Sequence, residues 1–163
     1  MKLKFVIVLS LFLINSIWSQ NTELDIKLNN NREYLIKELT KMVHDDQNIR
    51  TLIGELKDQE KEDSLWDIQD SLDRINIVKL ITITKKYGFP NPDRLKAPLS
   101  VWLIFQHTPK EFIQEVKILL KKENEQGRFY NNEFNLVLWH LGGRIGLPTI
   151  NDNGVLKIDL RNQ

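Results

Sequence analysis

The fold is decided by one stretch near the middle of the chain, Pro98-Leu-Ser-Val-Trp-Leu-Ile-Phe-Gln-His-Thr-Pro-Lys-Glu111. Its residues Val101 to Phe105 are apolar on every side, which is typical of a helix that is buried all round. Two polar residues, Gln106 and His107, end the apolar run before a new helix begins. We therefore expect a buried central helix that begins near Pro98 and whose polar end lies at the centre of any functional site.

Further helices are predicted on either side of this stretch from the spacing of apolar residues. Steps of three, four and seven place an apolar face on each of the segments 31–56, 109–126 and 131–145. Thr108 and Glu111 have the spacing of a capping box that would open the helix after the central one. A loop with two prolines is expected over residues 90–97.

The segment over residues 64–87 is compatible with two structures. Its apolar residues form two stripes that differ in phase, first Leu65, Ile68, Leu72 and Ile75, then Ile77, Leu80, Ile81 and Thr84. The change of phase predicts two helical pieces that meet near Asp73, whereas the β-branched run 81–84 is also compatible with a strand. Two lysines followed by Gly88 favour a helix that ends there.

The C-terminal residues have a different pattern. Asn151-Asp-Asn-Gly154 is a turn signal, and apolar and charged residues alternate over residues 156–161. This pattern predicts one short strand, or a hairpin if residues 147–150 pair with it. The predicted fold class is therefore all-α: a single domain of about five helices over residues 31–150, followed by a short β-like tail at residues 151–163.

The N-terminal residues 1–19 have the layout of a secretory signal peptide. Lys2 and Lys4 precede an almost entirely apolar run, and small and polar residues follow it. The alternative is an uncleaved membrane anchor, but the apolar run is only about half of the roughly 20 residues that a spanning helix needs. We expect an exported bacterial protein, periplasmic or extracellular, with a flexible leader at residues 20–30 and no membrane span after cleavage.

The net charge, the lack of cysteine and the glycine spacing limit which partners, stabilising bonds and cofactors we expect. The formal net charge of the chain is +1, and loss of the two signal-peptide lysines would make it −1. A nearly neutral balance argues against nucleic acid as a partner, because phosphate binding needs clustered positive charge. The chain has no cysteine, so a hydrophobic core rather than disulfides must stabilise it. The glycines of residues 142–146 do not match a phosphate-binding loop or a dinucleotide fingerprint, and no cofactor is expected.

Asp46 interrupts the apolar face of the helix predicted over residues 31–56. Gln47 lies beside it in the chain and Arg50 follows one turn later. One interpretation is a solvated ion pair between Asp46 and Arg50. If Asp46 is buried, however, its charge must be paired or neutralised, and buried acids of this kind cluster at functional sites. Asp46, Gln47 and Arg50 are therefore candidate site residues.

Three more candidates lie at helix ends. Gln106 and His107 are predicted at the corner after the central helix, where the helix dipole would favour a charged histidine. His107 is either a structural corner residue or a general acid/base or anion ligand. Arg144 adjoins the apolar stripe of the last helix, and we expect it to pair with Asp46 if the first and last helices touch. Otherwise Arg144 is an exposed residue at a helix end loosened by glycines.

The sequence contains no local metal or nucleophile motif. The three histidines lack the i,i+4 spacing of a helical zinc site, so zinc would require tertiary assembly and no metal site is predicted. A serine nucleophile in the pattern G-x-S-x-G is also absent.

Four short motifs occur in order over residues 45–150. They are Asp46-Gln47-x-x-Arg50, Tyr87-Gly88-Phe89-Pro90, Trp102-Leu103-x-x-Gln106-His107, and Arg144-Ile145 followed by Gly146 and Pro148. In these motifs the chain resembles an uncharacterised bacterial family, domain of unknown function 6624. Members of that family usually have an acid just before the late arginine and a glutamine soon after the Gly-x-Pro, where this chain has Gly143 and Thr149. The resemblance implies no activity, because the family has none assigned.

Two hypotheses of function follow, and whether the protein is an enzyme stays open. The first is a non-enzymatic exported protein that binds a small molecule or another envelope component, or has a structural role. The second is a hydrolase-like enzyme in which His107 is the general acid/base, and Asp46 and Arg50 orient the substrate or each other.

Overall fold

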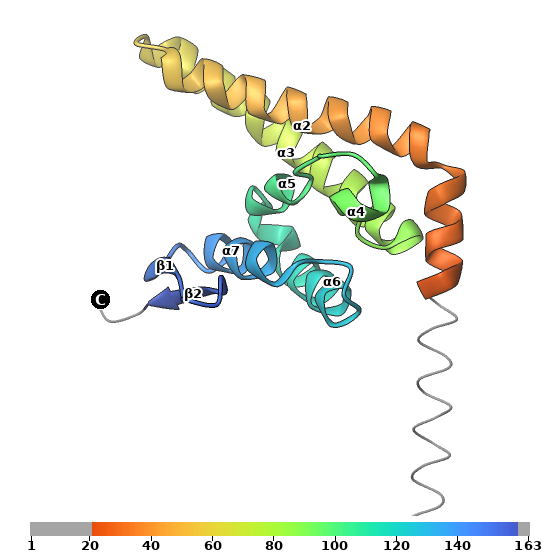
Figure 1. Cartoon of the computed structure of the whole chain (residues 1–163). Coiled ribbons are helices and arrows are strands. Elements are labelled where there is room, and N and C mark those ends of the chain that lie inside the picture. Colours follow the sequence, from red (N-terminus) through yellow and green to blue (C-terminus); the bar gives the residue numbers. More distant parts are fainter. Residues whose placement is uncertain (1–20, 160–163) are drawn as a thin grey trace, which may run out of the picture.

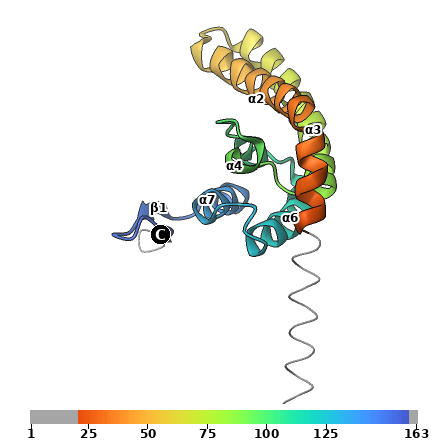
Figure 2. The ribbon, with the colours of Figure 1, turned by 45° about the vertical axis from the view of Figure 1, so that its right-hand side comes forward.

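A long antiparallel helical hairpin forms the back of the molecule. The structure is a computed structural model in which residues 21–159 are described. The hairpin consists of α2 (Arg32–Glu55) and α3 (Gln59–Tyr87), and the smaller elements pack against one side of it (Figure 1 and Figure 2). Its far end, around the turn between α2 and α3, projects beyond the rest of the molecule (Figure 1). None of the helices in residues 21–159 combines the length and the apolar character needed to cross a membrane.

The predicted apolar face of α2 is buried, as its spacing indicates. Leu35, Leu39, Met42 and Ile53 are all in the core. Asp46 occupies the slot between Met42 and Ile53 on the same face, and its side chain is only 1% exposed. The carboxylate of Asp46, which interrupts the apolar pattern, is therefore buried in the structure.

A single continuous helix covers residues 59–87, so the predictions of two helical pieces and of a strand are both wrong. No proline or glycine interrupts the segment. The second apolar stripe is in the core, whereas Ile68 and Ile75 of the first stripe are 50% and 63% exposed. The change of phase therefore reflects which face of the helix is packed against the core, and it does not mark a break in the helix. The β-branched run stays helical because its buried side chains pack in the core, an effect that overrides intrinsic propensity.

The central helix is shorter than predicted. It is α5 (Trp102–Gln106), which begins well after Pro98. Ile104 and Phe105 are its buried residues, and Val101, just before the helix, is also buried. A further short helix, α4 (Pro92–Leu95), lies in the predicted loop. The Asn91 side chain caps α4 by accepting a hydrogen bond of 2.9 Å from the Arg94 backbone N–H, and proline follows at the first helical position.

The corner after α5 does not contain the predicted capping box. Thr108 Oγ1 donates a 2.7 Å hydrogen bond backwards to the carbonyl of Phe105, and Glu111 pairs with Arg74 of α3. The next helix begins without a side-chain cap, as a 3-10 turn η1 (Lys110–Phe112) that continues into α6 (Ile113–Glu125). Glu111 pairs with a residue of a helix that is distant in sequence, and a local motif cannot predict such a partner.

The motif Tyr87-Gly88-Phe89-Pro90 is a buried turn. Gly88 has φ +72°, and a Cβ there would lie 2.8 Å from Cδ of Arg128. The Glu123 carboxylate accepts hydrogen bonds from the backbone N–H of Phe89 at 2.7 Å and from Arg128 Nε at 2.6 Å. Phe89 packs edge-on against Phe129, with ring centroids 4.4 Å apart. This motif therefore holds the end of α3 against α6 and has a structural role.

The last helix ends earlier than predicted. It is α7 (Asn131–Leu141), which ends before Ile145, and Ile145 is 57% exposed. After a glycine-containing turn, β1 (Leu147–Ile150) pairs antiparallel with β2 (Leu156–Asp159). The hairpin alternative is thus confirmed, and the tail unit begins at residue 147, not 151. The all-α prediction with a short β tail is confirmed.

Residues 21–30 of the expected leader are ordered. Residues 21–30 are helical, and their direction changes sharply before α2 begins (Figure 1). Leu28 is buried, and Arg94 Nε donates a 2.9 Å hydrogen bond to Asp25. The prediction of a flexible leader is therefore wrong for these residues, because side chains far along the chain bind them. The signal peptide predicted at residues 1–19 lies outside the described residues.

Candidate functional site

Asp46 is buried together with three hydrogen-bond donors. Its carboxylate accepts from Gln47 Nε2 at 2.7 Å, from Gln69 Nε2 at 3.0 Å and from Arg50 Nε at 3.2 Å. Gln47 and Arg50 come from α2 itself, whereas Gln69 comes from α3. The carboxylate is paired and hydrogen-bonded, which is the condition under which a buried charge is tolerated.

A second carboxylate shares two of these donors. Arg50 Nη2 donates to both oxygens of Asp73, at 2.7 and 2.8 Å, and Gln69 Nε2 donates to Asp73 Oδ1 at 2.7 Å. Gln69 is fully buried and has both amide hydrogens directed at carboxylates. We call these five residues, Asp46, Gln47, Arg50, Gln69 and Asp73, the buried polar cluster. It joins α2 to α3 where the hairpin passes the central helix.

The buried polar cluster contains two acids and only one cation. Burial raises the pKa of Asp73, an effect that the hydrogen bonds from Arg50 and Gln69 oppose and the charge of Asp46 reinforces. One guanidinium therefore does not fully compensate two carboxylates in a partly desolvated place. Asp73, the acid whose charged form is disfavoured, is the member of the cluster that lines a pocket.

His107 is a neutral imidazole next to this cluster. Burial, followed by the positive charge of Arg50, lowers the pKa of His107 to about 4, against a weaker opposing effect of Asp46. The expectation that the helix dipole makes His107 a cation is therefore wrong. The helix that ends there has only five residues, so its dipole is small compared with desolvation. A neutral imidazole both donates and accepts one hydrogen bond.

A polar pocket of about 390 Å³ lies between α3 and the corner after α5. It is lined by Asp70, Asp73, Arg74, Gln106, His107, Thr108, Pro109, Lys110 and Glu111. Its volume falls within the range of small-molecule sites. The buried polar cluster supplies Asp73 to this pocket and lies behind it, so that α2 supports a wall formed by α3.

The six predicted site residues are only partly brought together. Asp46, Gln47 and Arg50 belong to the buried polar cluster, and Gln106 and His107 line the adjoining pocket. Arg144 does not pair with Asp46. It is exposed, and its Nε lies 3.2 Å from Nδ1 of His140.

The sequence analysis missed Gln69 and Asp73. They lie one helical turn apart on α3, and the only available signal was the change of phase near Asp73. Pairing with Asp46 and Arg50 depends on how α3 folds back along α2, since the partners are 23 positions apart in the sequence. That register is a tertiary property.

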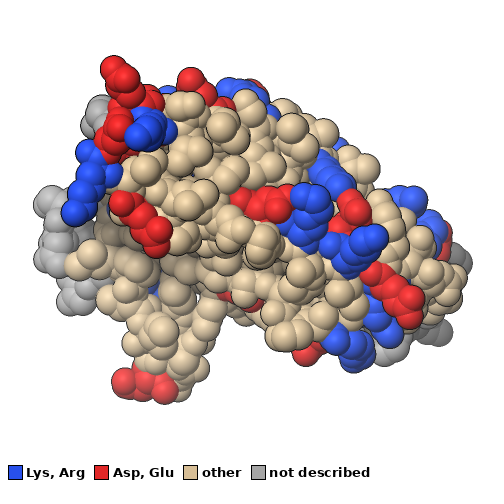
Figure 3. All heavy atoms as spheres, turned by 90° about the horizontal axis from the view of Figure 1, so that it is seen from above, with Lys and Arg blue, Asp and Glu red and all other residues tan. Residues whose placement is uncertain are grey.

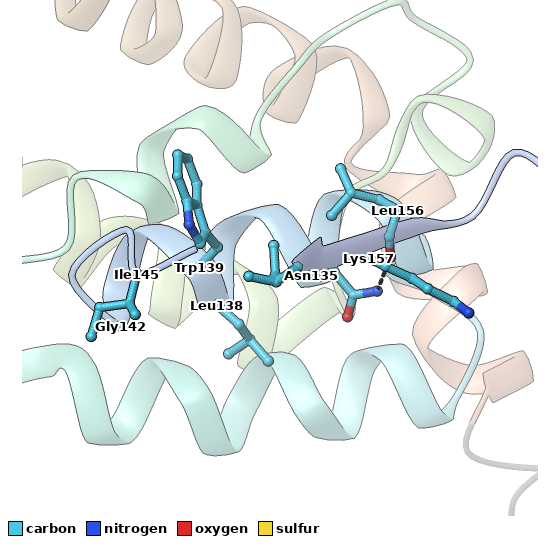
Figure 4. A pocket seen from close by; sticks show the side chains of 8 residues that line it. Asn135, Leu138, Trp139, Gly142, Ile145, Leu156 and Lys157 are labelled. Atoms are coloured by element: carbon cyan, nitrogen blue, oxygen red, sulfur yellow. Dashed lines mark hydrogen bonds between the residues drawn. The ribbon is translucent and has the colours of Figure 1, made fainter. Parts of the chain in front are cut away.

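A larger groove lies elsewhere, between α7 and the β hairpin. Its volume is about 560 Å³, and Leu138, Trp139 and Leu156 are among the apolar residues that line it (Figure 4). Asn135 Nδ2 donates a 3.2 Å hydrogen bond to the carbonyl of Leu156 across one end (Figure 4). Lys157 is the only charged residue among its lining residues, so the groove lacks the acid and base groups that gather at the polar pocket.

The described residues contain no metal-binding cluster, and one face of the molecule carries charges of both signs. Within residues 21–159, no three histidine or acidic side chains are arranged to hold a metal ion. On the face shown in Figure 3, acidic and basic side chains are interspersed. The pocket itself is lined by acid, amide, imidazole, guanidinium and ammonium groups.

None of the protein-family models, curated proteins or solved structures compared with this chain matches it. Membership of the family named above therefore stays a prediction, and function must be inferred from the pocket itself.

Proposed function

We propose that this domain binds a small polar molecule in the pocket between α3 and the corner after α5. One observation carries the proposal: a buried ionic cluster stands directly behind a pocket wall that contains a neutral histidine. Buried ion pairs contribute little net stability compared with apolar residues of the same size. Perturbed, partly buried groups at a concave surface are instead characteristic of binding and active sites.

The buried polar cluster would serve to hold the pocket wall in position. Both oxygens of Asp73 are engaged by Arg50, which fixes the carboxylate, and Gln69 ties it to Asp46. The side chains of Gln106 and His107 line the pocket and make no hydrogen bond within residues 21–159. Their donors and acceptors are therefore available to a ligand. A rigid wall with unused hydrogen-bonding groups favours binding because little ordering is needed when the ligand arrives.

Ligand-induced thermal stabilisation tests this function. We would screen the purified protein against separate sets of sugars, nucleosides, carboxylic acids, amines and amino acids. The expected result is that at least one set raises the melting temperature, because a ligand that binds only the native state stabilises it. His107→Ala should abolish the rise while the unliganded protein still unfolds cooperatively. His44→Ala is the matched control, because its side chain is 66% exposed and lies outside the pocket. No shift with any set would refute a binding function and leave the structural role.

The second candidate function is hydrolysis with His107 as general base. The neutral state of His107 is the one that a base requires, and Asp73 adjoins the same pocket. A pKa of about 4 makes the imidazole a weak base, and no serine or cysteine nucleophile lines the pocket, so water would be the attacking group. Turnover of chromogenic ester, amide or phosphate substrates that is lost in His107→Ala but kept in His44→Ala would favour this function over simple binding.

Export is part of the same proposal. The charge and apolar pattern of residues 1–19 supports cleavage after Ser19 and a periplasmic or extracellular location. Expression of the full chain in a bacterium, followed by cell fractionation and intact-mass measurement, tests it. A soluble product that begins at Gln20 is expected. A full-length product in the membrane fraction would support the anchor alternative, and a full-length cytoplasmic product would refute export.

A further inference from the structure

The polar pocket contains two unpartnered charges of opposite sign. Of the charged side chains that line it, Asp73 is engaged by Arg50, and Arg74 and Glu111 pair with each other. Asp70 and Lys110 are left, and neither has an ion pair or side-chain hydrogen bond within residues 21–159. Asp70 is on α3, and Lys110 is at the start of η1, so the two charges belong to different elements that border the pocket.

We infer that the ligand of this pocket is a small zwitterion, an α-amino acid or a compound with the same pair of end groups. The inference rests on the proposed binding function and specifies its ligand class. The ammonium group of the ligand would bind at Asp70, beside the carboxylate of Asp73. Its carboxylate would bind at Lys110, on the side of the pocket formed by the corner after α5.

The distribution of charge argues against a purely anionic or cationic ligand. An anion at Lys110 would have Asp70 and Asp73 on the facing element, and like charges at close range disfavour binding. A cation at Asp70 would leave the Lys110 ammonium without a partner and beside a second positive charge. A zwitterion presents one charge to each side, so both ends meet a group of opposite sign.

Gln106 and His107 suit the part of the ligand between its charged ends. Both side chains are partly buried, line the same pocket, and can donate and accept hydrogen bonds. Because His107 is neutral at pH 7, it adds no further charge to the site. A cavity of about 390 Å³ accommodates a ligand with a side chain of moderate size.

Isothermal titration with end-blocked ligands tests the inference. The probes are the free amino acids, assayed singly, together with their N-acetyl and carboxamide derivatives. Blocking either end should weaken binding roughly ten- to a hundredfold, the range for loss of one charge-assisted hydrogen bond. Asp70→Asn should remove the penalty for N-acetylation only, and Lys110→Gln should remove the penalty for the carboxamide only. This crossed pattern is specific to a ligand held at both ends.

Matched control variants keep the charge change but move it outside the pocket. Asp67→Asn lies one turn earlier on α3, and Lys121→Gln lies on the exposed side of α6; both should keep full discrimination between free and blocked ligands. Binding that is equally strong for blocked and free amino acids would overturn the zwitterion inference, as would binding of another probe set but no amino acid. In both of those cases the binding function itself stands. If no probe set binds, both the zwitterion inference and the binding function are overturned.

Discussion

Replacement of Glu133 by glutamine should stabilise the protein at neutral and alkaline pH. Glu133 lies in the first turn of α7, and its Oε2 is buried with no hydrogen-bond partner in the described part of the chain. Burial raises the pKa of this carboxyl from 4.5 to about 7. The native state therefore disfavours the ionised form, and Glu133→Gln keeps the shape of the side chain without the charge.

The size of the effect follows from the pKa. A rise from 4.5 to about 7 corresponds to about 3 kcal/mol between the two protonation states. Solvent reaches part of the side chain and the dipole of α7 favours a negative charge there, so we expect a net gain of about 1–2 kcal/mol. The sign is fixed by the raised native pKa: the penalty is absent below pH 4.5, grows as pH rises to 7, and is constant above it.

Urea denaturation of the wild type and Glu133→Gln at several pH values between 4 and 8 measures this difference. The two proteins should have similar free energies of unfolding at pH 4, and the variant should be about 1–2 kcal/mol more stable at pH 8. Glu60→Gln, in the exposed first turn of α3, controls for the loss of a helix-dipole interaction and should show no such gain. A difference between wild type and Glu133→Gln that does not change with pH would refute the reasoning.

Three further outcomes test the buried polar cluster, the turn after α3 and the histidine. Arg50→Met leaves the buried Asp46 and the partly buried Asp73 without their cation and should cost about 3–5 kcal/mol in urea denaturation; a loss under 1 kcal/mol would contradict the pairing. Gly88→Ala should cost about 1–3 kcal/mol because of its φ of +72° and its contact with Arg128, whereas Gly54→Ala, with open space around it, should be neutral or stabilising. An NMR titration should show that His107 protonates near pH 4, and a midpoint near 6.5 would disprove its burial beside a cation.

Local sequence patterns were sufficient for most of the secondary structure. The apolar spacing of α2 and α6 identified their buried faces, and the turn signal at residues 151–154 offered the hairpin as one of two alternatives. These features depend on neighbours within a few residues, where periodicity and turn chemistry act directly. Local patterns failed where a side chain has a competing partner, whether nearby in the chain or on a distant element. Thr108 and Glu111 fit a capping box, yet the carbonyl of Phe105 and the Arg74 guanidinium bind them instead.

By itself, the sequence placed Asp46 on the apolar face of its helix and Arg50 one turn away from it, because both positions follow from the helical period. Only the tertiary structure decided what Asp46 and Arg50 bind. Gln69 and Asp73 come to them through the register of α3 along α2, which depends on how the whole hairpin packs. The tertiary structure also decided that His107 is neutral, since desolvation and the charge of Arg50 outweigh any local effect of the helix end.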